Sequence, residues 1–279
     1  MSLRINTNTI GMFSVSQLRK SNELLSSSLE RLATGKRINR AADDAAGMTM
    51  ADSLSSQARG LGQAMRNAND AISMGQVAEG ALSESTSIIQ TIRGKALQAA
   101  QEGQSLESRQ ALQADIDKAV ASLNDIAANT SYNGQPLLSG TFTNRQFQVG
   151  AAPGETVSAS LGSAAANTLG GENGSLAEIN VLTQEGAQAA IGIVDQALEQ
   201  VGGMRAEIGA MQNQLSSTVS NLSVTAINVQ SAQSSIADVD YAEESMVFAR
   251  MKALNKAKVF AATQANNLNK GNVLNLLQG

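Results

Sequence analysis

The 279-residue chain contains no cysteine, no histidine and no tryptophan, and it has only two prolines. Without cysteine it cannot form disulfides. Without cysteine or histidine it lacks the commonest general base, the best thiol nucleophile and the usual zinc ligands. We therefore expect no enzyme activity, no catalytic residues, no cofactor and no metal site. The adjacent pair Asp43-Asp44 is better interpreted as a helix N-cap, because neighbouring helical positions point about 100° apart.

Aromatic residues are also scarce, with five Phe and two Tyr, so the apolar side chains are mainly small aliphatic ones and ten Met. Such side chains suit thin seams between helices better than a thick globular core. The net charge is −4 with no basic block, so neither nucleic acid nor an anionic membrane surface is favoured as a partner. No apolar run is long enough for membrane insertion, and the first residues, MSLRINTNTIGMFSV, lack the apolar core of a cleaved signal peptide.

The two prolines, Pro136 and Pro153, lie near the middle of the chain. Proline costs about 3 kcal/mol in a helix interior, so both flanks are free to form long helices. On both flanks apolar residues recur at alternating spacings of three and four, which is typical of amphipathic helices. Both flanks should therefore be helical, and the chain should fold back so that its terminal helices lie side by side. The pattern predicts helices over 12–33, 43–100, 112–126, 187–229 and 247–268.

The middle of the chain has a different pattern. Apolar and polar residues alternate from Phe147 to Leu161, on both sides of an Ala-Ala-Pro-Gly turn, which predicts a β-hairpin near 145–162. Residues 162–175 are rich in Gly, Ser, Ala and Asn, which predicts a loop. The expected fold is mainly α: a long antiparallel helical coiled-coil or bundle rod with one small β-hairpin and paired N- and C-terminal helices.

The two terminal helices each carry one apolar stripe, and pairing them covers only part of each stripe. Two helices alone make a poor core, and small units of this kind usually need metals, disulfides or oligomerisation. Neighbouring copies could cover the stripes, and a heterologous contact that does not close produces a helical filament. The alternative is that the ends dock on the chain's own long helices, and composition and spacing leave both possibilities open. The candidate polymerisation interface comprises Val15, Leu18, Leu25, Leu29, Leu32, Val247, Met251, Leu254, Leu268, Leu274 and Leu277.

Five segments in order along the chain resemble one protein family. The run LERLATGKRINRAADDAAG at 29–47 closely resembles the N-terminal signature of bacterial flagellins. Later segments, TSYNG, FQVGA, AATQAN and NVLNLL, resemble further flagellin motifs, the last two at the flagellin C-terminus. The chain thus resembles a short flagellin without large outer domains, because only a short segment joins the hairpin to the returning helix.

The resemblance implies a structural subunit that self-assembles into the helical flagellar filament for swimming motility. It implies type III export without a cleaved signal peptide and an extracellular location in the filament. The implied partners are further copies of the chain, the flagellar cap and hook-junction proteins, and an export chaperone at the C-terminal helix. The alternative within this class is a hook–filament junction (hook-associated) protein, and an unrelated alternative is a monomeric helical adhesin. The implied domains are a filament-core helical domain, 1–42 with 237–279, and a rod domain, 43–175 with 176–236.

One short stretch bears on innate-receptor recognition. Some flagellins are sensed by a vertebrate Toll-like receptor through the first long rod helix, and this chain matches that family pattern at Ile89, Gln90 and Arg93. Thr91 stands where the recognised flagellins usually carry arginine. By resemblance, we expect recognition to be weakened or absent.

Overall fold

The computed structural model describes residues 8–171 and 174–278, and toward the end of the last helix the side chains of Leu268, Leu277 and several neighbours lie outside the described residues. The chain divides into two units. Unit 1 comprises Met1–Ser56 with Asn228–Gly279, and unit 2 comprises Gln57–Ile227. The domain limits at 42, 175 and 236 that the resemblance implies stay predictions.

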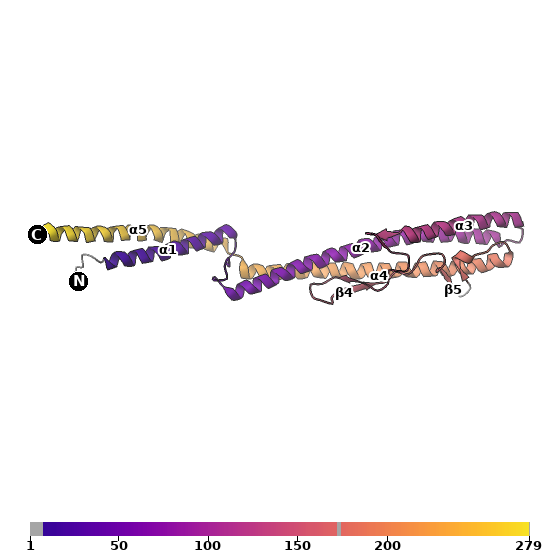
Figure 1. Cartoon of the computed structure of the whole chain (residues 1–279), viewed down its shortest axis with the longest axis horizontal. Coiled ribbons are helices and arrows are strands. Elements are labelled where there is room, and N and C mark those ends of the chain that lie inside the picture. Colours follow the sequence, from indigo (N-terminus) through magenta and orange to yellow (C-terminus); the bar gives the residue numbers. More distant parts are fainter. Residues whose placement is uncertain (1–7, 172–173, 279) are drawn as a thin grey trace. The chain divides into compact units, whose positions relative to one another are not determined.

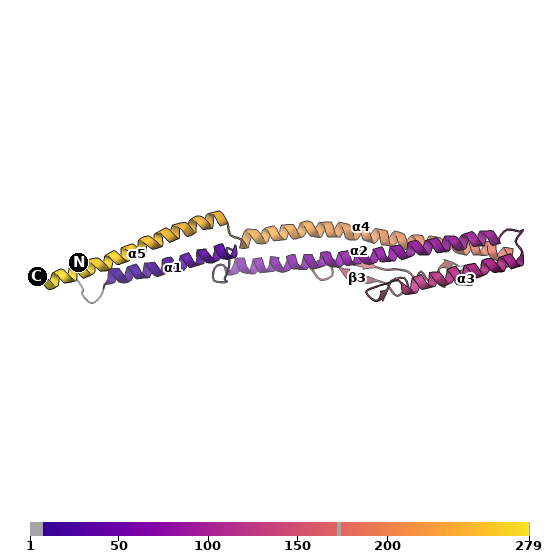
Figure 2. The same ribbon diagram turned by 90° about the horizontal axis from the view of Figure 1, so that it is seen from above.

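Unit 1 is built around two antiparallel terminal helices, α1 (Thr9–Thr34) and α5 (Tyr241–Gln278), which lie side by side in Figures 1 and 2. Asn8 caps the N-terminus of α1, because its side chain accepts a hydrogen bond of 2.8 Å from the Gly11 N–H. Gly35 caps the C-terminus, and its φ of 70° is the left-handed conformation that favours glycine. The expected side-by-side pairing of the terminal helices is thus confirmed.

The segment between α1 and α2 (Ala45–Ala99) is fixed by backbone N–H groups that donate hydrogen bonds to two aspartates. Asp44 caps α2 by accepting a hydrogen bond of 2.9 Å from the Gly47 N–H, which confirms that the acidic pair marks a helix start. Asp43 accepts hydrogen bonds from the backbone N–H groups of Asn39 and Arg40, at 3.1 and 3.0 Å. These bonds lower the pKa of Asp43 below its usual 3.8, because they favour the ionised form.

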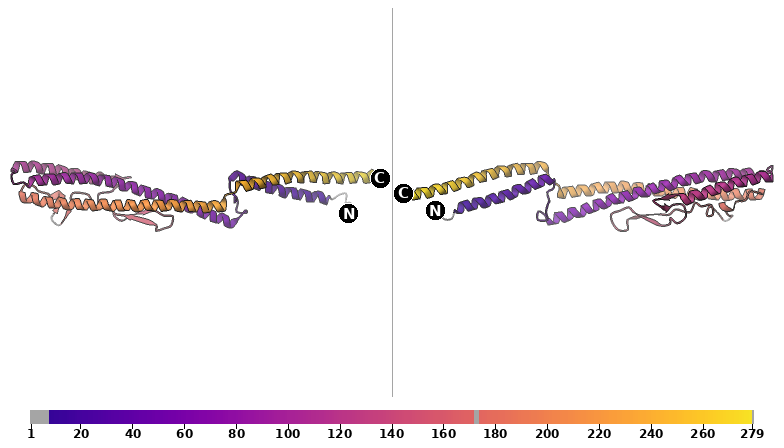
Figure 3. Two further views of the ribbon diagram at one scale, coloured as in Figure 1. Left: turned by 180° about the vertical axis from the view of Figure 1, so that it is seen from behind. Right: turned by 45° about the horizontal axis from the view of Figure 1, so that its top comes forward.

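Unit 2 consists of most of α2, helix α3 (Leu106–Asn129) and most of α4 (Gln184–Ala237), with the strands and loops between α3 and α4 packed on them (Figure 3). Ion pairs link the helices: Lys95 contacts Asp115 at 2.7 Å, and Arg205 contacts Glu79 at 2.7 Å. Leucine, isoleucine, valine and alanine dominate the core, as the scarcity of aromatics predicts. Its largest fully buried side chains include Leu82, Ile89, Ile92, Ile116, Leu123, Leu137, Leu138, Leu169, Leu176 and Ile208.

Small antiparallel strand pairs join α3 to α4. Strands β3 (Arg145–Gln148) and β4 (Thr156–Ala159) form the hairpin expected near 145–162, with Phe147 opposite Val157. The sequence predicted a single hairpin, whereas the described residues contain two further antiparallel strand pairs. The remaining elements are β1 (Ser131–Tyr132), β2 (Gln135–Pro136), β5 (Gly170–Gly171), β6 (Gly174–Ser175) and the short 3₁₀ helix η1 (Leu176–Glu178).

The long helices follow the predicted pattern closely. Helix α2 continues through six glycines, and at one of them, Gly75, a side chain would come within 3.1 Å of Met211 and Gln212 of α4. Helix α5 continues to Gln278, so the apolar repeat that stops at 268 underestimates its length. A single glycine such as Gly271 costs a helix only about 1 kcal/mol, which is too little to end it. The mainly helical fold class is confirmed.

Candidate assembly surface

The α1–α5 pair has a fixed register, set by polar contacts spread along its length. The Asn8 side-chain amide donates a hydrogen bond of 3.1 Å to Asn266, and the Asn255 amide donates to Asn22. Near the other end, Arg31 of α1 lies 3.8 Å from the Glu244 carboxylate of α5. The residue numbers of each pair add up to nearly the same value, as an antiparallel pair in continuous register requires.

The seam between these two helices is lined by small residues. The buried residues of α1 are Gly11, Ser21 and Ser28, and Ala262 is buried on α5. A side chain at Gly11 would come within 2.9 Å of the Asn266 side chain, so glycine permits the close approach there. The two backbones therefore pack closely, but little apolar surface is buried between them.

Two hydroxyls in this seam have no partner. The Oγ atoms of Ser21 and Ser28 are buried and accept or donate no hydrogen bond within the part of the chain that the structure describes. Burying an unpaired hydroxyl costs about 1–3 kcal/mol. The seam is thus weaker than a leucine-lined seam of the same length.

Most of the large apolar side chains of α1 and α5 lie outside the seam and are exposed. Phe13 of α1 is 66% exposed and Phe260 of α5 is 73% exposed, although aromatic side chains gain most from burial. Large exposed apolar patches are typical of sites that bind other proteins or membranes. We call this set the terminal apolar surface: Ile10, Met12, Phe13, Val15, Leu24, Leu29, Tyr241, Met246, Leu254, Val259, Phe260 and Leu274.

The structure separates the predicted polymerisation residues into two groups. The first group is half-buried in unit 1: Leu18, Leu25, Leu32, Val247 and Met251. The second group belongs to the terminal apolar surface: Val15, Leu29, Leu254 and Leu274. Leu268 and Leu277 have side chains outside the described residues. Sequence reasoning missed the two most exposed phenylalanines, because it followed a single heptad stripe and they lie off it.

The predicted receptor stretch lies on α2 within unit 2. Ile89 is completely buried in the core of unit 2, so its side chain is not accessible at the helix surface. Gln90 and Thr91 are exposed. Arg93 donates a hydrogen bond of 2.6 Å to Asp195 of α4, which raises the pKa of its guanidinium group. The weakened receptor recognition stays a prediction.

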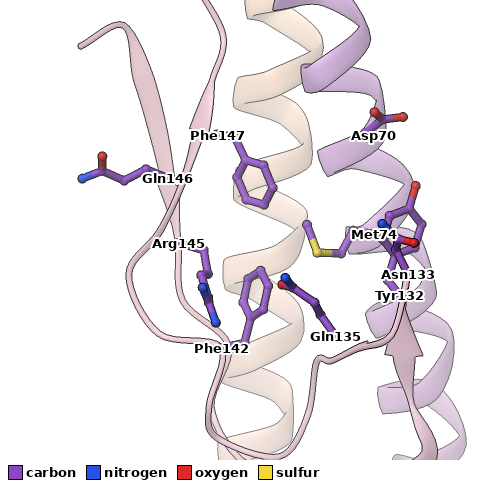
Figure 4. Close-up of a pocket in the computed structure, with 9 residues that line it drawn as sticks. All are labelled: Asp70, Met74, Tyr132, Asn133, Gln135, Phe142, Arg145, Gln146 and Phe147. Carbon is purple, nitrogen blue, oxygen red and sulfur yellow. The ribbon is translucent and has the colours of Figure 1, made fainter. Parts of the chain in front are cut away.

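A cavity of about 320 Å³ lies beside the hairpin of unit 2. Figure 4 shows the rings of Phe142 and Phe147 together on one side of it and Met74 of α2 facing them. The ring centroids are 6.5 Å apart, and the Arg145 guanidinium lies 5.8 Å from the Phe142 centroid. Asp70 and Arg145 are the charged residues that line the cavity. The stacked rings and the covering arginine help the hairpin to pack on α2.

Within the described ranges, no three His, Cys, Asp or Glu side chains come together in a way that could hold a metal ion. Nor does any helix there combine the length and apolar character that crossing a lipid bilayer would need.

Comparison with known proteins gives a consistent result. The family profile for the bacterial flagellin N-terminal helical region matches residues 5–143, and that for the bacterial flagellin C-terminal helical region matches residues 191–277. Flagellin B of Helicobacter pylori is 54% identical over 170 residues, covering 61% of this chain and 33% of that protein. The matched part of the chain thus spans about a third of the length of the Helicobacter flagellins.

Other relatives match from end to end. Flagellin FlaB2 of Treponema pallidum and the flagellar filament 33 kDa core protein of Treponema phagedenis are each 36% identical over 285 residues, covering 98% of this chain and 99% of the relative. Among solved structures, a Vibrio parahaemolyticus protein described as flagellar hook-associated has the same fold. Its TM-score is 0.59 at 16% identity, over 70% of this chain and all of that one. On these matches, the chain belongs to the bacterial flagellin family.

Proposed function

We propose that the chain is the structural subunit of a flagellar filament, and that it acts by self-assembly and not by catalysis. The observation that carries this proposal is the terminal apolar surface of α1 and α5, which the chain itself leaves uncovered. Two packed helices offer no third layer, so copies of the same unit are the partners that could cover it. The family membership and the filament core protein among the relatives support the same function.

The energetics favour assembly through these side chains. Burying a Leu, Phe or Met side chain that is otherwise in water contributes about 1.5–3 kcal/mol. Phe13, Phe260 and Leu254 are between 44% and 73% exposed, so each has substantial apolar area to lose on assembly. The weak α1–α5 seam fits this proposal, because a closed and self-sufficient pair would not need neighbours.

The filament subunit accounts for the family relationships better than a hook–filament junction protein. The likeness to the hook-associated protein is one of fold, at 16% identity, whereas the Treponema relatives named as flagellin and filament core protein match at 36%. As a filament subunit the chain would be extracellular. Its other partners would be the cap, the hook-junction proteins and an export chaperone on α5.

The test is assembly of a Leu254→Asp variant. Leu254 is 44% exposed, so the substitution should leave the α1–α5 pair folded while placing a charge in the subunit contact. We expect no filaments by negative-stain electron microscopy, with unchanged circular dichroism of the dispersed chain. The matched control is Leu254→Met, which keeps an apolar side chain of similar volume and should still assemble. Normal filaments from Leu254→Asp would contradict an interface at this position.

Half-buried Leu25 provides a second test. Leu25→Asp should also abolish filaments, but it should in addition loosen the α1–α5 pair because Leu25 lies at the seam. Filament growth from seeds without a length limit would separate a filament subunit from a junction protein, which would bind the seed end and stop.

A further inference from the structure

Helix α5 carries only basic charged residues over most of its length. Residues 245–279 contain five lysines and arginines and no aspartate or glutamate, although the whole chain has a net charge of −4. The rest of the chain is correspondingly acidic. Whole-chain charge therefore hides a segment without acids, and the expectation that an anionic membrane surface is disfavoured rests on that average and on the lack of a continuous basic block.

Three of these lysines share one side of α5 with exposed apolar residues. A helix turns once every 3.6 residues, so Lys252, Lys256 and Lys270 project from the same side of α5. All three are exposed. Three apolar residues of the same side are exposed by 45%, 73% and 56%: Val259, Phe260 and Leu274. We call these six residues the lysine face.

The positive charge of the lysine face is not neutralised by neighbouring carboxylates. No ion pair joins Lys252, Lys256 or Lys270 to a carboxylate in the portion of the chain that the structure describes. The nearest acid along α5, Glu244, is buried against α1 at 3.8 Å from Arg31. Helix α1 itself carries three basic residues and two acidic ones, Glu23 and Glu30.

The lysine face matches the chemistry of an anionic lipid surface. Helices that lie in the interface of a bilayer combine Lys or Arg with Phe and Leu, and the long lysine stems let the ammonium groups reach the headgroups while apolar atoms stay buried. Nucleic acid would use the lysines but would leave Phe260 and Leu274 in water. We propose that the lysine face of the unassembled chain binds the surface of an anionic phospholipid bilayer, with α5 lying in the plane of the interface.

This interaction differs from filament assembly in what drives it. Each lysine near an anionic membrane contributes about 1 kcal/mol, and the contribution falls with added salt. Assembly through the terminal apolar surface would depend mainly on apolar burial, which salt weakens little. Phe260 and Leu274 belong to both surfaces, so membrane binding and assembly would compete for the same copies.

The experiment uses the absence of tryptophan in the chain. In a Phe260→Trp variant of the full chain the new side chain is the single indole and reports directly on the lysine face. The dispersed protein is titrated with vesicles of phosphatidylcholine alone and with vesicles in which about a third of the lipid is phosphatidylglycerol. We expect a blue-shifted emission and co-sedimentation with the anionic vesicles, both lost at high salt, and neither with phosphatidylcholine alone.

Matched charge variants in the Phe260→Trp background locate the binding site. Lys252→Gln/Lys256→Gln/Lys270→Gln should weaken partitioning by about a hundredfold, at roughly fivefold per lysine. The control removes the same charge from exposed positions of unit 2: Arg59→Gln/Arg66→Gln/Lys118→Gln. It should bind within about twofold of the parent, because these charges do not belong to the lysine face.

Several results would overturn the proposal. Equal binding to neutral and anionic vesicles, or an unchanged tryptophan emission, would exclude the lysine face as a lipid-binding surface. An equal loss in the unit 2 control would show that overall charge, not this face, governs binding. Tighter binding to duplex DNA than to the anionic vesicles would reassign the face to nucleic acid. Filament formation is scored separately by electron microscopy of the Leu254→Asp variant, so failure of either proposal is visible without the other.

Discussion

The side-chain amide of Asn255 on α5 donates a hydrogen bond to the side-chain oxygen of Asn22 on α1, in the middle of the terminal helix pair. A polar pair at one position of a helix seam favours a single register, because any slip leaves both amides without their partner. Polar contacts at both ends, Asn8 with Asn266 and Arg31 with Glu244, favour the same register. The terminal pair is thus specified more by polar matching than by apolar burial.

The first prediction concerns this amide pair. Asn255→Ala should weaken α1–α5 pairing by about 1 kcal/mol. Adding Asn22→Ala to this variant should weaken it much less, because the hydrogen bond is already lost. Hydrogen exchange of the α1 amides measures the effect. Asn267→Ala, at an exposed position of the same helix, is the control and should change little. Additive losses from the two substitutions would show that the amides do not interact.

A second prediction follows from the unpaired hydroxyls of the seam. Ser21→Ala and Ser28→Ala should each raise the stability of unit 1 by about 1 kcal/mol, since each removes a buried hydroxyl without a partner. The control is Ser26→Ala. Ser26 is exposed, so this substitution should raise the stability only by the small difference in helix propensity between serine and alanine. Thermal unfolding followed by circular dichroism gives the ranking. A loss of stability in the seam variants would mean that the hydroxyls are bonded in solution.

Two glycines of α2 should respond in opposite ways. Nothing lies within 4 Å of a side chain built at Gly80, so Gly80→Ala should stabilise the helix by about 1 kcal/mol. At Gly75 the added methyl would meet Met211 and Gln212 at 3.1 Å, so the same gain should be cancelled or reversed. Chemical denaturation of the two variants in parallel measures the difference. Equal stabilisation by the two variants would show that the Met211 and Gln212 side chains of α4 move aside at little cost.

The segment before α2 should be sensitive to acid. The hydrogen bonds from Asn39 and Arg40 hold the pKa of Asp43 below 3.8 in the folded chain. The resulting stability is fully present above the unfolded pKa and is lost as the pH falls through the lower, folded pKa. The protection of the Asn39 and Arg40 backbone amides against hydrogen exchange should therefore fall only in that acidic range. Asp43→Asn should remove this pH dependence of the protection. A pH-independent difference between the parent and the variant would contradict the assignment.

The helices could be predicted from the sequence because their signals are local. A chain with prolines only at 136 and 153 and with a sustained three-four apolar spacing leaves little choice but helix on both flanks. The β5–β6 pair could not be predicted from local patterns, since its glycines are typical of a loop. It is held by Gln200 of α4, which bonds the Gly170 backbone from 30 residues away, and no local pattern reveals such a contact.

The terminal apolar surface was predicted only in part, for a similar reason. The leucine spacing shows that Leu25 and Leu29 share a stripe, but not that Leu25 lies half-buried at the seam while Leu29 stays 55% exposed. Ser21 and Ser28 are polar in any sequence pattern, yet they are buried because α5 packs closely against them. Which side of a helix faces its partner depends on that packing, and the sequence of one helix does not contain it.

Hydrogen exchange of the α1 and α5 amides in the dispersed chain and in assembled filaments tests the central claim most directly. If other copies cover the terminal apolar surface, these amides should exchange at least about a hundredfold more slowly in filaments, while those of the unit 2 core change little. Amides of α1 and α5 that are already as protected in the dispersed chain as in the filament would contradict it.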